Sequence, residues 1–254
     1  AHVSCLAEQA KILVAEAEYN NLDDKVKLER FGRWEMCSLC EQSYHSVVKC
    51  ALGWACWKTY LGRPETDMPR QLAMSVLGNG LHDADQHEDA LTVREADLSM
   101  RRRLGASEDA ILFVRSNLAN TYQMLGRHEE ALSMRRDAYS GRLRLHGEEQ
   151  EETLRAASNY AVSLADLQRF KEAKSLMRKT MPMVRRVLGE SHDLTLKMRK
   201  IYADALYRDD GATLDDVCEA LETLEQLEQT SRRVFGRAHP HTKQIALSNR
   251  NARD

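Results

Sequence analysis

The feature that most constrains this sequence is a glycine that recurs at a nearly constant interval. Each of these glycines follows an apolar residue or a histidine at the end of a charged segment, and the successive intervals are 43, 42, 42 and 47 residues. A period of this length is typical of repeat proteins, in which each repeat is one supersecondary unit stacked on its neighbours. The glycines are Gly62, Gly105, Gly147, Gly189 and Gly236.

An alanine repeats in the same register as the glycine, 15 or 16 residues before each of the last four of them. Between a glycine and the next alanine, apolar residues three and four apart, such as Leu118, Tyr122 and Leu125, predict one helix. The segment that begins around the alanine predicts a second helix, which ends at the next glycine. Each repeat is therefore predicted to be helix, turn, helix. The alanines Ala90, Ala131, Ala173 and Ala220 are expected to be buried where the paired helices touch.

The pattern predicts four helix pairs and one final helix. The pairs cover 68–82 with 86–104, 108–125 with 128–146, 150–167 with 170–188 and 191–209 with 214–235, and the last helix starts at about 240. Composition agrees with an all-α fold, because 4 Pro and 12 Gly in 254 residues are too few for a β-sandwich or barrel with a turn every ten residues.

Charge and hydropathy restrict the partners. The 37 basic residues nearly balance the 39 acidic ones, so no global field attracts nucleic acid or an anionic membrane. The apolar runs are too short for a membrane-spanning helix. We expect neither nucleic acid nor membrane as a partner, and a cytoplasmic location. The chain starts with Ala rather than Met, which predicts that it has been cut from a longer protein.

The repeats resemble tetratricopeptide repeats of the kinesin light chain type. The resemblance is carried by NLANTYQMLGRHEEA at 117–131 and by the junctions GESHDLT and GRAHPHT, and it covers 62–254. It implies a right-handed α-solenoid with repeats at 62–104, 105–146, 147–188 and 189–235, followed by a C-terminal helix at 239–253. Two features depart from the family: Arg94 and Arg135 replace a usual aromatic residue, and Pro182 should kink its helix.

The residues before the first repeat predict two further segments. Residues 42–61 read as one connecting or capping helix, with Cys50, Trp54, Cys56 and Trp57 in the core. Residues 1–41 resemble a truncated zinc finger of the RING-CH type, through the pairs His2 with Cys5 and Cys37 with Cys40. Both spacings allow two side chains to reach one zinc ion.

The zinc-finger resemblance implies two incomplete sites. In that family's interleaved order, the His2 and Cys5 pair and the Cys37 and Cys40 pair serve different zinc ions, and the other pair of each site is absent here. Zinc would be bound in the full-length protein, whereas this chain would coordinate none completely. The alternative is that the C-x2-C pair is a core or chance feature. His45 is interpreted as an ordinary surface histidine.

Two functions follow from these features. The first is a protein-interaction scaffold or adaptor without enzymatic activity, since no phosphate-binding loop or nucleophile motif is present. The second is the substrate-recognition part of a RING-CH type ubiquitin ligase, whose full-length form would contact a ubiquitin-conjugating enzyme. In both functions, the partner would bind in a concave groove. Asparagines at repeated first-helix positions are interpreted as lining this groove or, alternatively, as ordinary solvated side chains. These are Asn79, Asn117, Asn120 and Asn159.

Arginines also recur three residues before four of the glycines. They are interpreted either as a docking edge for an acidic partner or as charges that complement the negative ends of their helices. These are Arg102, Arg144, Arg186 and Arg233.

Overall fold

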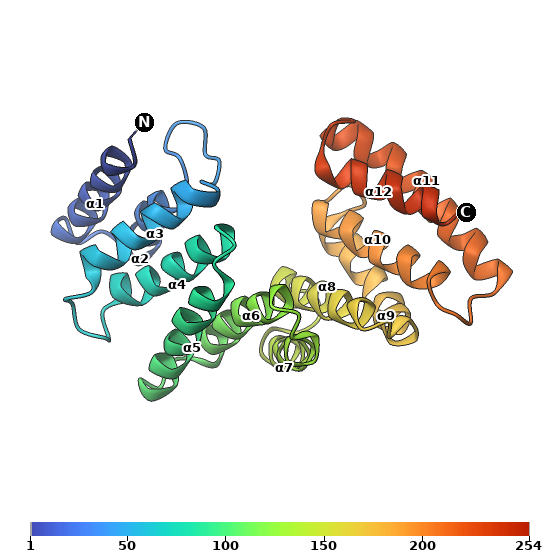
Figure 1. Ribbon diagram of the computed structural model, residues 1–254, viewed down its shortest axis with the longest axis horizontal. Helices are drawn as coiled ribbons and strands as arrows, with labels where there is room; N and C mark the ends of the chain where they lie inside the picture. The colour runs from blue at the N-terminus through green and yellow to red at the C-terminus, as the bar shows by residue number, and fades with distance from the viewer. Residues whose placement is uncertain (1, 254) are drawn as a thin grey trace. The chain divides into compact units, whose positions relative to one another are not determined.

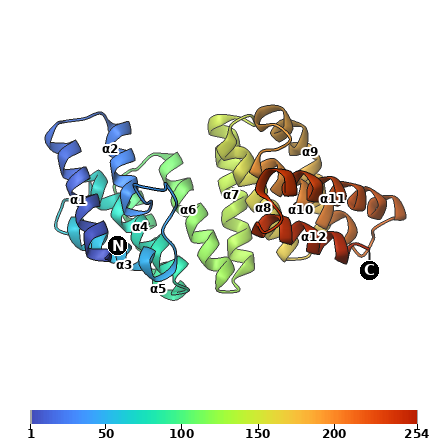
Figure 2. The same cartoon turned by 90° about the horizontal axis from the view of Figure 1, so that it is seen from above.

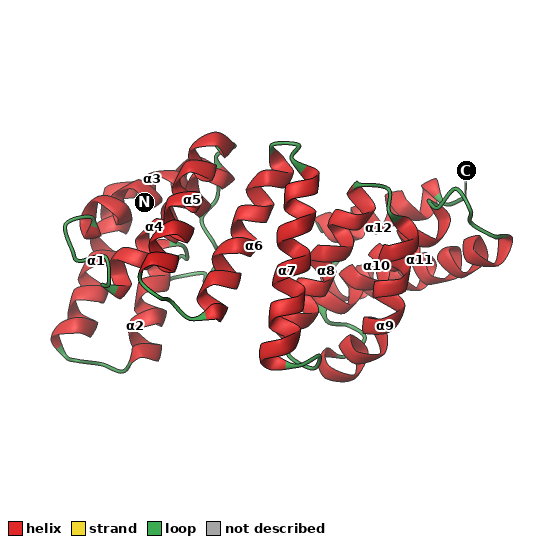
Figure 3. Ribbon diagram, turned by 90° about the horizontal axis from the view of Figure 1, so that it is seen from below, coloured by secondary structure: helices red, strands yellow, loops and turns green. Residues whose placement is uncertain are grey.

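The computed structural model describes residues 2–253, in which all regular secondary structure is helical apart from one isolated bridge between Met36 and Ser43 (Figure 3). The chain forms two compact units, one ending at Arg127 and the other beginning at His128. The predicted all-α solenoid class is confirmed, because the helices follow one another as stacked pairs within each unit. No helix in this described range is both long and apolar enough to cross a membrane.

Among the described residues, the first unit contains six α-helices and one 3₁₀ turn, and its α-helices are labelled in Figure 1. They are α1 (Val3–Tyr19), α2 (Asp24–Phe31), η1 (Gly32–Trp34), α3 (Ser46–Tyr60), α4 (Met68–Asp83), α5 (His87–Arg103) and α6 (Glu108–Met124). Side-chain caps start several of them: the Asp67 carboxylate accepts the Arg70 N–H at 3.0 Å at the start of α4, and the Ser107 hydroxyl accepts the Ala110 N–H at 3.3 Å at the start of α6.

The N-terminal helices share one core with the first repeat. Trp34, wholly buried, meets the ring of Tyr60 edge-on at 6.1 Å, and Phe31 and Val14 pack into the same cluster. Helix α3 packs against α4, with Gly53 and Gly80 at the contact. Within segment 42–61, helix α3 runs from Ser46 to Tyr60, residues 42–45 are not helical, and α1 packs against α3.

One expected core residue of α3 is exposed. Cys50 and Cys56 are buried and Trp57 is half-buried, but Trp54 is 43% exposed. The prediction for Trp54 was wrong because the buried face of α3 is defined by positions such as 53, 56 and 60, and position 54 points away from them.

Up to residue 253, the second unit contains six α-helices. They are α7 (His128–His146), α8 (Glu151–Asp166), α9 (Phe170–Leu188), α10 (Asp193–Tyr207), α11 (Leu214–Phe235) and α12 (Pro240–Asn251). Helix α10 contacts α8, α9 and α11 and thereby links successive helix pairs (Figure 2). A capping box starts α11, in which Thr213 and Asp216 each bind the other's backbone N–H.

The sequence landmarks have clear structural roles. Ala90, Ala131, Ala173 and Ala220 are at most 1% exposed, which confirms the prediction that they are buried. Gly189 and Gly236 directly follow α9 and α11 with φ of 84° and 85°, a conformation that strongly favours glycine. Helix α9 runs from Phe170 to Leu188 with Pro182 inside it.

Candidate protein-interaction surface

Two buried arginines occupy the same position in successive repeats. Arg94 on α5 and Arg135 on α7 each lie four residues after their landmark alanine and are 5% and 6% exposed. Burial lowers the pKa of each to about 10. Both guanidiniums therefore stay charged at neutral pH.

Each of these arginines binds the first helix of the following repeat in the same way. Arg94 Nη1 donates to the carbonyl oxygen of Asn117 at 2.6 Å and to the hydroxyl of Thr121. Arg135 Nη1 donates to the carbonyl oxygen of Asn159 at 3.2 Å and to the hydroxyl of Ser163 at 2.8 Å. A charged donor thus takes the place of the expected aromatic residue, and it satisfies acceptors that packing would otherwise leave buried.

The four predicted groove asparagines lie half-buried on first helices. Asn79 is held from two sides, since its Nδ2 donates to Glu35 Oε1 at 3.0 Å and its Oδ1 accepts from Arg94 Nη2 at 3.1 Å. Asn117 presents its carbonyl to the same arginine. Asn159 Oδ1 accepts from Lys197 Nζ at 3.5 Å. The structure thus groups Asn79 and Asn117 around Arg94 and places Asn159 beside Lys197; whether these residues and Asn120 bind a peptide stays a prediction.

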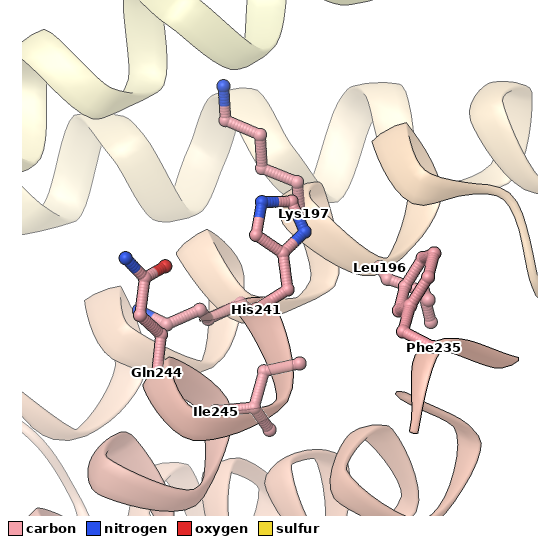
Figure 4. A pocket seen from close by; sticks show the side chains of 7 residues that line it. Leu196, Lys197, Phe235, His241, Gln244 and Ile245 are labelled. Carbon is pink, nitrogen blue, oxygen red and sulfur yellow. The ribbon is translucent and has the colours of Figure 1, made fainter. Parts of the chain in front are cut away.

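A pocket lies where α10 and α12 meet (Figure 4). Its polar wall comes from Lys197, Lys200, His241 and Gln244, and its apolar part from Leu196, Phe235 and Ile245. Figure 4 shows the Lys197 side chain extending past the His241 ring, with Gln244 on the neighbouring turn of α12. We call this set of residues the α10–α12 pocket.

The charges of the α10–α12 pocket are only partly neutralised. His241 Nδ1 lies 2.8 Å from Asp193 Oδ1, and Lys200 Nζ donates to Asp204 Oδ2 at 2.6 Å. Lys197, in contrast, bonds the neutral amide of Asn159. Burial, followed by the charge of Arg135, lowers the pKa of Lys197. An acidic group placed in this pocket would therefore meet a partly desolvated cation.

Sequence reasoning missed the residues of this pocket and the acceptors of the buried arginines. The sequence does contain a hydroxyl residue at a repeated distance from each arginine: Thr121 follows Arg94 by 27 residues and Ser163 follows Arg135 by 28. Lys197 and Gln244 also share a repeat position, because each follows its glycine by eight residues, as Arg155 follows Gly147. This repeated polar position does not by itself indicate a pocket.

The predicted zinc ligands lie in two different settings. His2 precedes α1 and Cys5 lies in its first turn, whereas Cys37 and Cys40 lie in the turn between η1 and α3. There the Leu39 N–H lies 3.5 Å from Cys37 Sγ, and hydrogen bonds from the Cys40 and Leu39 backbone lower the pKa of Cys37. Within residues 2–253, no three His, Cys, Asp or Glu side chains are grouped so that they could hold a metal ion. Zinc binding by the full-length protein stays a prediction.

The half-buried His82 predicts acid sensitivity of the first unit. Burial, together with the charges of Arg94 and His87, lowers the pKa of His82 from 6.5 to about 4. The folded protein keeps this imidazole neutral, whereas the unfolded chain takes up a proton below pH 6.5, so stability present above that pH is lost as the pH falls toward 4. We expect the thermal midpoint of the wild type to fall more steeply over this range than that of His82→Gln, measured by circular dichroism.

The exposed His45 provides the control for this experiment. His45→Gln should follow the wild-type profile. Parallel profiles for the wild type and His82→Gln would show that His82 does not carry the acid sensitivity.

Comparison with known proteins supports the repeat assignment. The tetratricopeptide repeat family model matches residues 114–152 and 153–193. No curated protein matches the sequence significantly.

Solved structures share the fold at low sequence identity. BtubC (BKLC) from P. vanneervenii superposes with a TM-score of 0.61 at 15% identity, covering 99% of this chain and 83% of that one. A putative kinesin light chain from P. anserina with nearly identical tetratricopeptide-like repeats gives 0.60 at 16%, covering 92% and 97%. A Rap protein complexed with competence and sporulation factor gives 0.53 at 14%, covering 97% and 64%. The chain therefore contains tetratricopeptide repeats and is structurally similar to kinesin light chain repeat proteins.

Proposed function

We propose that this chain is a protein-interaction scaffold or adaptor that binds a peptide or protein segment along the first helices of its repeats. The observation that carries the proposal is the polar set on first helices of the second unit, with Asn159 on α8, Lys197 on α10, and His241 and Gln244 on α12. Asn supplies a donor and an acceptor to an extended backbone, and Lys197 favours an acidic side chain.

The similar folds are consistent with this function. The Rap protein is described as complexed with competence and sporulation factor, so a related fold holds another molecule in that case. Repeat scaffolds serve many partners, and cargo transport does not follow from the fold. The partner of this chain is proposed as a class: an extended segment that contains at least one acidic residue.

The ligase alternative has weaker support. It requires complete zinc sites, and the described residues bring together no more than pairs of candidate ligands. No contact in residues 2–253 favours a ubiquitin-conjugating enzyme over another protein partner. We therefore propose the adaptor function and leave the ligase reading as a prediction for the full-length protein.

The double variant Asn117→Ala with Asn159→Ala tests the groove. Peptides selected from a displayed random library against the wild-type chain should bind the double variant roughly thirtyfold more weakly, because two hydrogen bonds are lost at about 1 kcal/mol each. The thermal midpoint should change little, since Arg94 and Arg135 bind the backbone carbonyls of these residues, which alanine keeps. The one side-chain bond that is lost, from Lys197 to Asn159, is long at 3.5 Å. Fluorescence anisotropy measures the affinity, and circular dichroism measures the midpoint.

The exposed Asn251 at the end of α12 supplies the matched control. Asn251→Ala should leave both affinity and midpoint unchanged. Unchanged affinity of the double variant with a lowered midpoint would mean that Asn117 and Asn159 are structural and that the groove assignment is wrong.

A further inference from the structure

A second pocket lies in the second unit, between α9, α10 and α11, apart from the α10–α12 pocket. It has a volume of about 210 Å³, and three of the residues that line it are arginines: Arg178 and Arg185 from α9 and Arg199 from α10. Arg178 and Arg185 are seven residues apart, a spacing that places both on one face of the helix. We call this the arginine pocket.

The carboxylates around the arginine pocket neutralise these charges incompletely. Glu190 is shared, with Oε1 3.2 Å from Arg185 Nε and Oε2 3.4 Å from Arg199 Nη1. Arg178 Nη2 is 3.9 Å from both Asp216 and Glu219, and Asp216 lies closer to Lys174, at 3.2 Å. Strong guanidinium–carboxylate hydrogen bonds are about 2.7–2.9 Å long, so each of these ion pairs is weaker than such a bond.

Arg199 is the most constrained of the three arginines. The residue is 7% exposed, and its Nη2 donates to Gln226 Oε1 at 3.0 Å. Its buried Nε–H has no hydrogen-bond partner among residues 2–253. A buried donor without an acceptor costs about 1–3 kcal/mol.

The rest of the wall is partly apolar. Met181, Pro182 and the ring of Tyr202 line the pocket, and the rest of its wall is Thr223 and the Glu219 carboxylate. Arg178 Nε donates to the Tyr202 hydroxyl at 3.0 Å. This hydroxyl in turn donates to Glu219 Oε1 at 2.7 Å, which holds both the ring and Arg178 in place. The pocket is therefore lined by three arginines, one carboxylate and an apolar wall.

We propose that the arginine pocket binds a phosphate-type oxyanion through Arg178, Arg185 and Arg199. The planar guanidinium offers paired N–H donors that match phosphate oxygens, and three such groups suit a doubly charged anion better than a single carboxylate. The apolar wall has room for an organic group attached to the phosphate. This proposal is independent of the peptide groove, because it uses a different pocket.

The test is a titration of the full chain at constant ionic strength with inorganic phosphate and, separately, with phenyl phosphate. Saturable shifts of arginine Nε–H resonances in NMR spectra are expected with at least one of the two ligands. Arg185→Gln should weaken binding about tenfold or more, because it removes one charged hydrogen bond. Arg185 is exposed, so the variant should stay folded, which circular dichroism checks.

Arg186 provides the matched control on the same helix, since it is exposed and pairs with Glu149 rather than lining the pocket. Arg186→Gln should bind like the wild type. Tighter binding of phenyl phosphate would identify an esterified phosphate as the preferred ligand, and equal binding a free anion. Absence of saturable binding by both ligands, or equal loss in the two variants, would overturn the proposal.

Discussion

Replacing Arg94 by alanine is expected to lower the free energy of unfolding by about 3 kcal/mol or more, the range of large-to-small substitutions in a core. The change leaves a cavity between α5 and α6 and removes the donor for the carbonyl of Asn117, the hydroxyl of Thr121 and the amide oxygen of Asn79. Each buried acceptor left without a donor adds about 1–3 kcal/mol to the cost. Urea denaturation followed by circular dichroism measures the loss.

Two further variants separate the causes. Arg102 lies on the same helix and is exposed, so Arg102→Ala should change stability by no more than about 0.5 kcal/mol. Arg94→Met keeps most of the volume but no donor, and it should fall between the wild type and Arg94→Ala. An Arg94→Met protein more stable than the wild type would mean that burying the charge costs more than its hydrogen bonds return.

Replacing Gly80 by alanine is expected to cost about 1–3 kcal/mol, the usual cost of overpacking. An added Cβ would lie 2.7 Å from the carbonyl oxygen of Lys49 and 2.9 Å from Cys50 Cα, so α3 and α4 would have to move apart. Both contacts are with backbone atoms, which cannot rotate away as a side chain can. The loss should occur although alanine is a better helix former than glycine by about 1 kcal/mol.

Gly62 provides the control for this substitution, because a Cβ at that position would meet no atom within 4 Å. Gly62→Ala should leave the midpoint of urea denaturation unchanged or raise it slightly. A neutral or stabilising Gly80→Ala would show that the α3–α4 contact adjusts and that Gly80 is not required for close approach of the helices.

The α10–α12 pocket and the arginine pocket were beyond sequence prediction, and so was the role of Glu35 as a partner of Asn79. Glu35 is 44 residues from Asn79 in the chain, and Arg94 is 23 residues from Asn117. Such pairs meet only when helices pack, and no local spacing encodes their meeting. The arginines at 94 and 135 were visible as departures from the family pattern. Their hydroxyl acceptors, Thr121 and Ser163, were visible only as a repeated residue type, and nothing in the sequence pairs them with the arginines.

The sequence by itself determined the helix pairs, their boundaries within about two residues, and the burial of the four landmark alanines. These depend on signals between residues close in the chain: the spacing of apolar residues, capping side chains, and glycines that take positive φ at Gly189 and Gly236. Tertiary structure alone decided that Trp54 is exposed while Trp34 is buried, and that Arg199 lines a pocket with two arginines of another helix. The physical reason is that burial, partial neutralisation of charge and pocket shape depend on which helix faces pack together, and that is set by contacts between segments far apart in the chain.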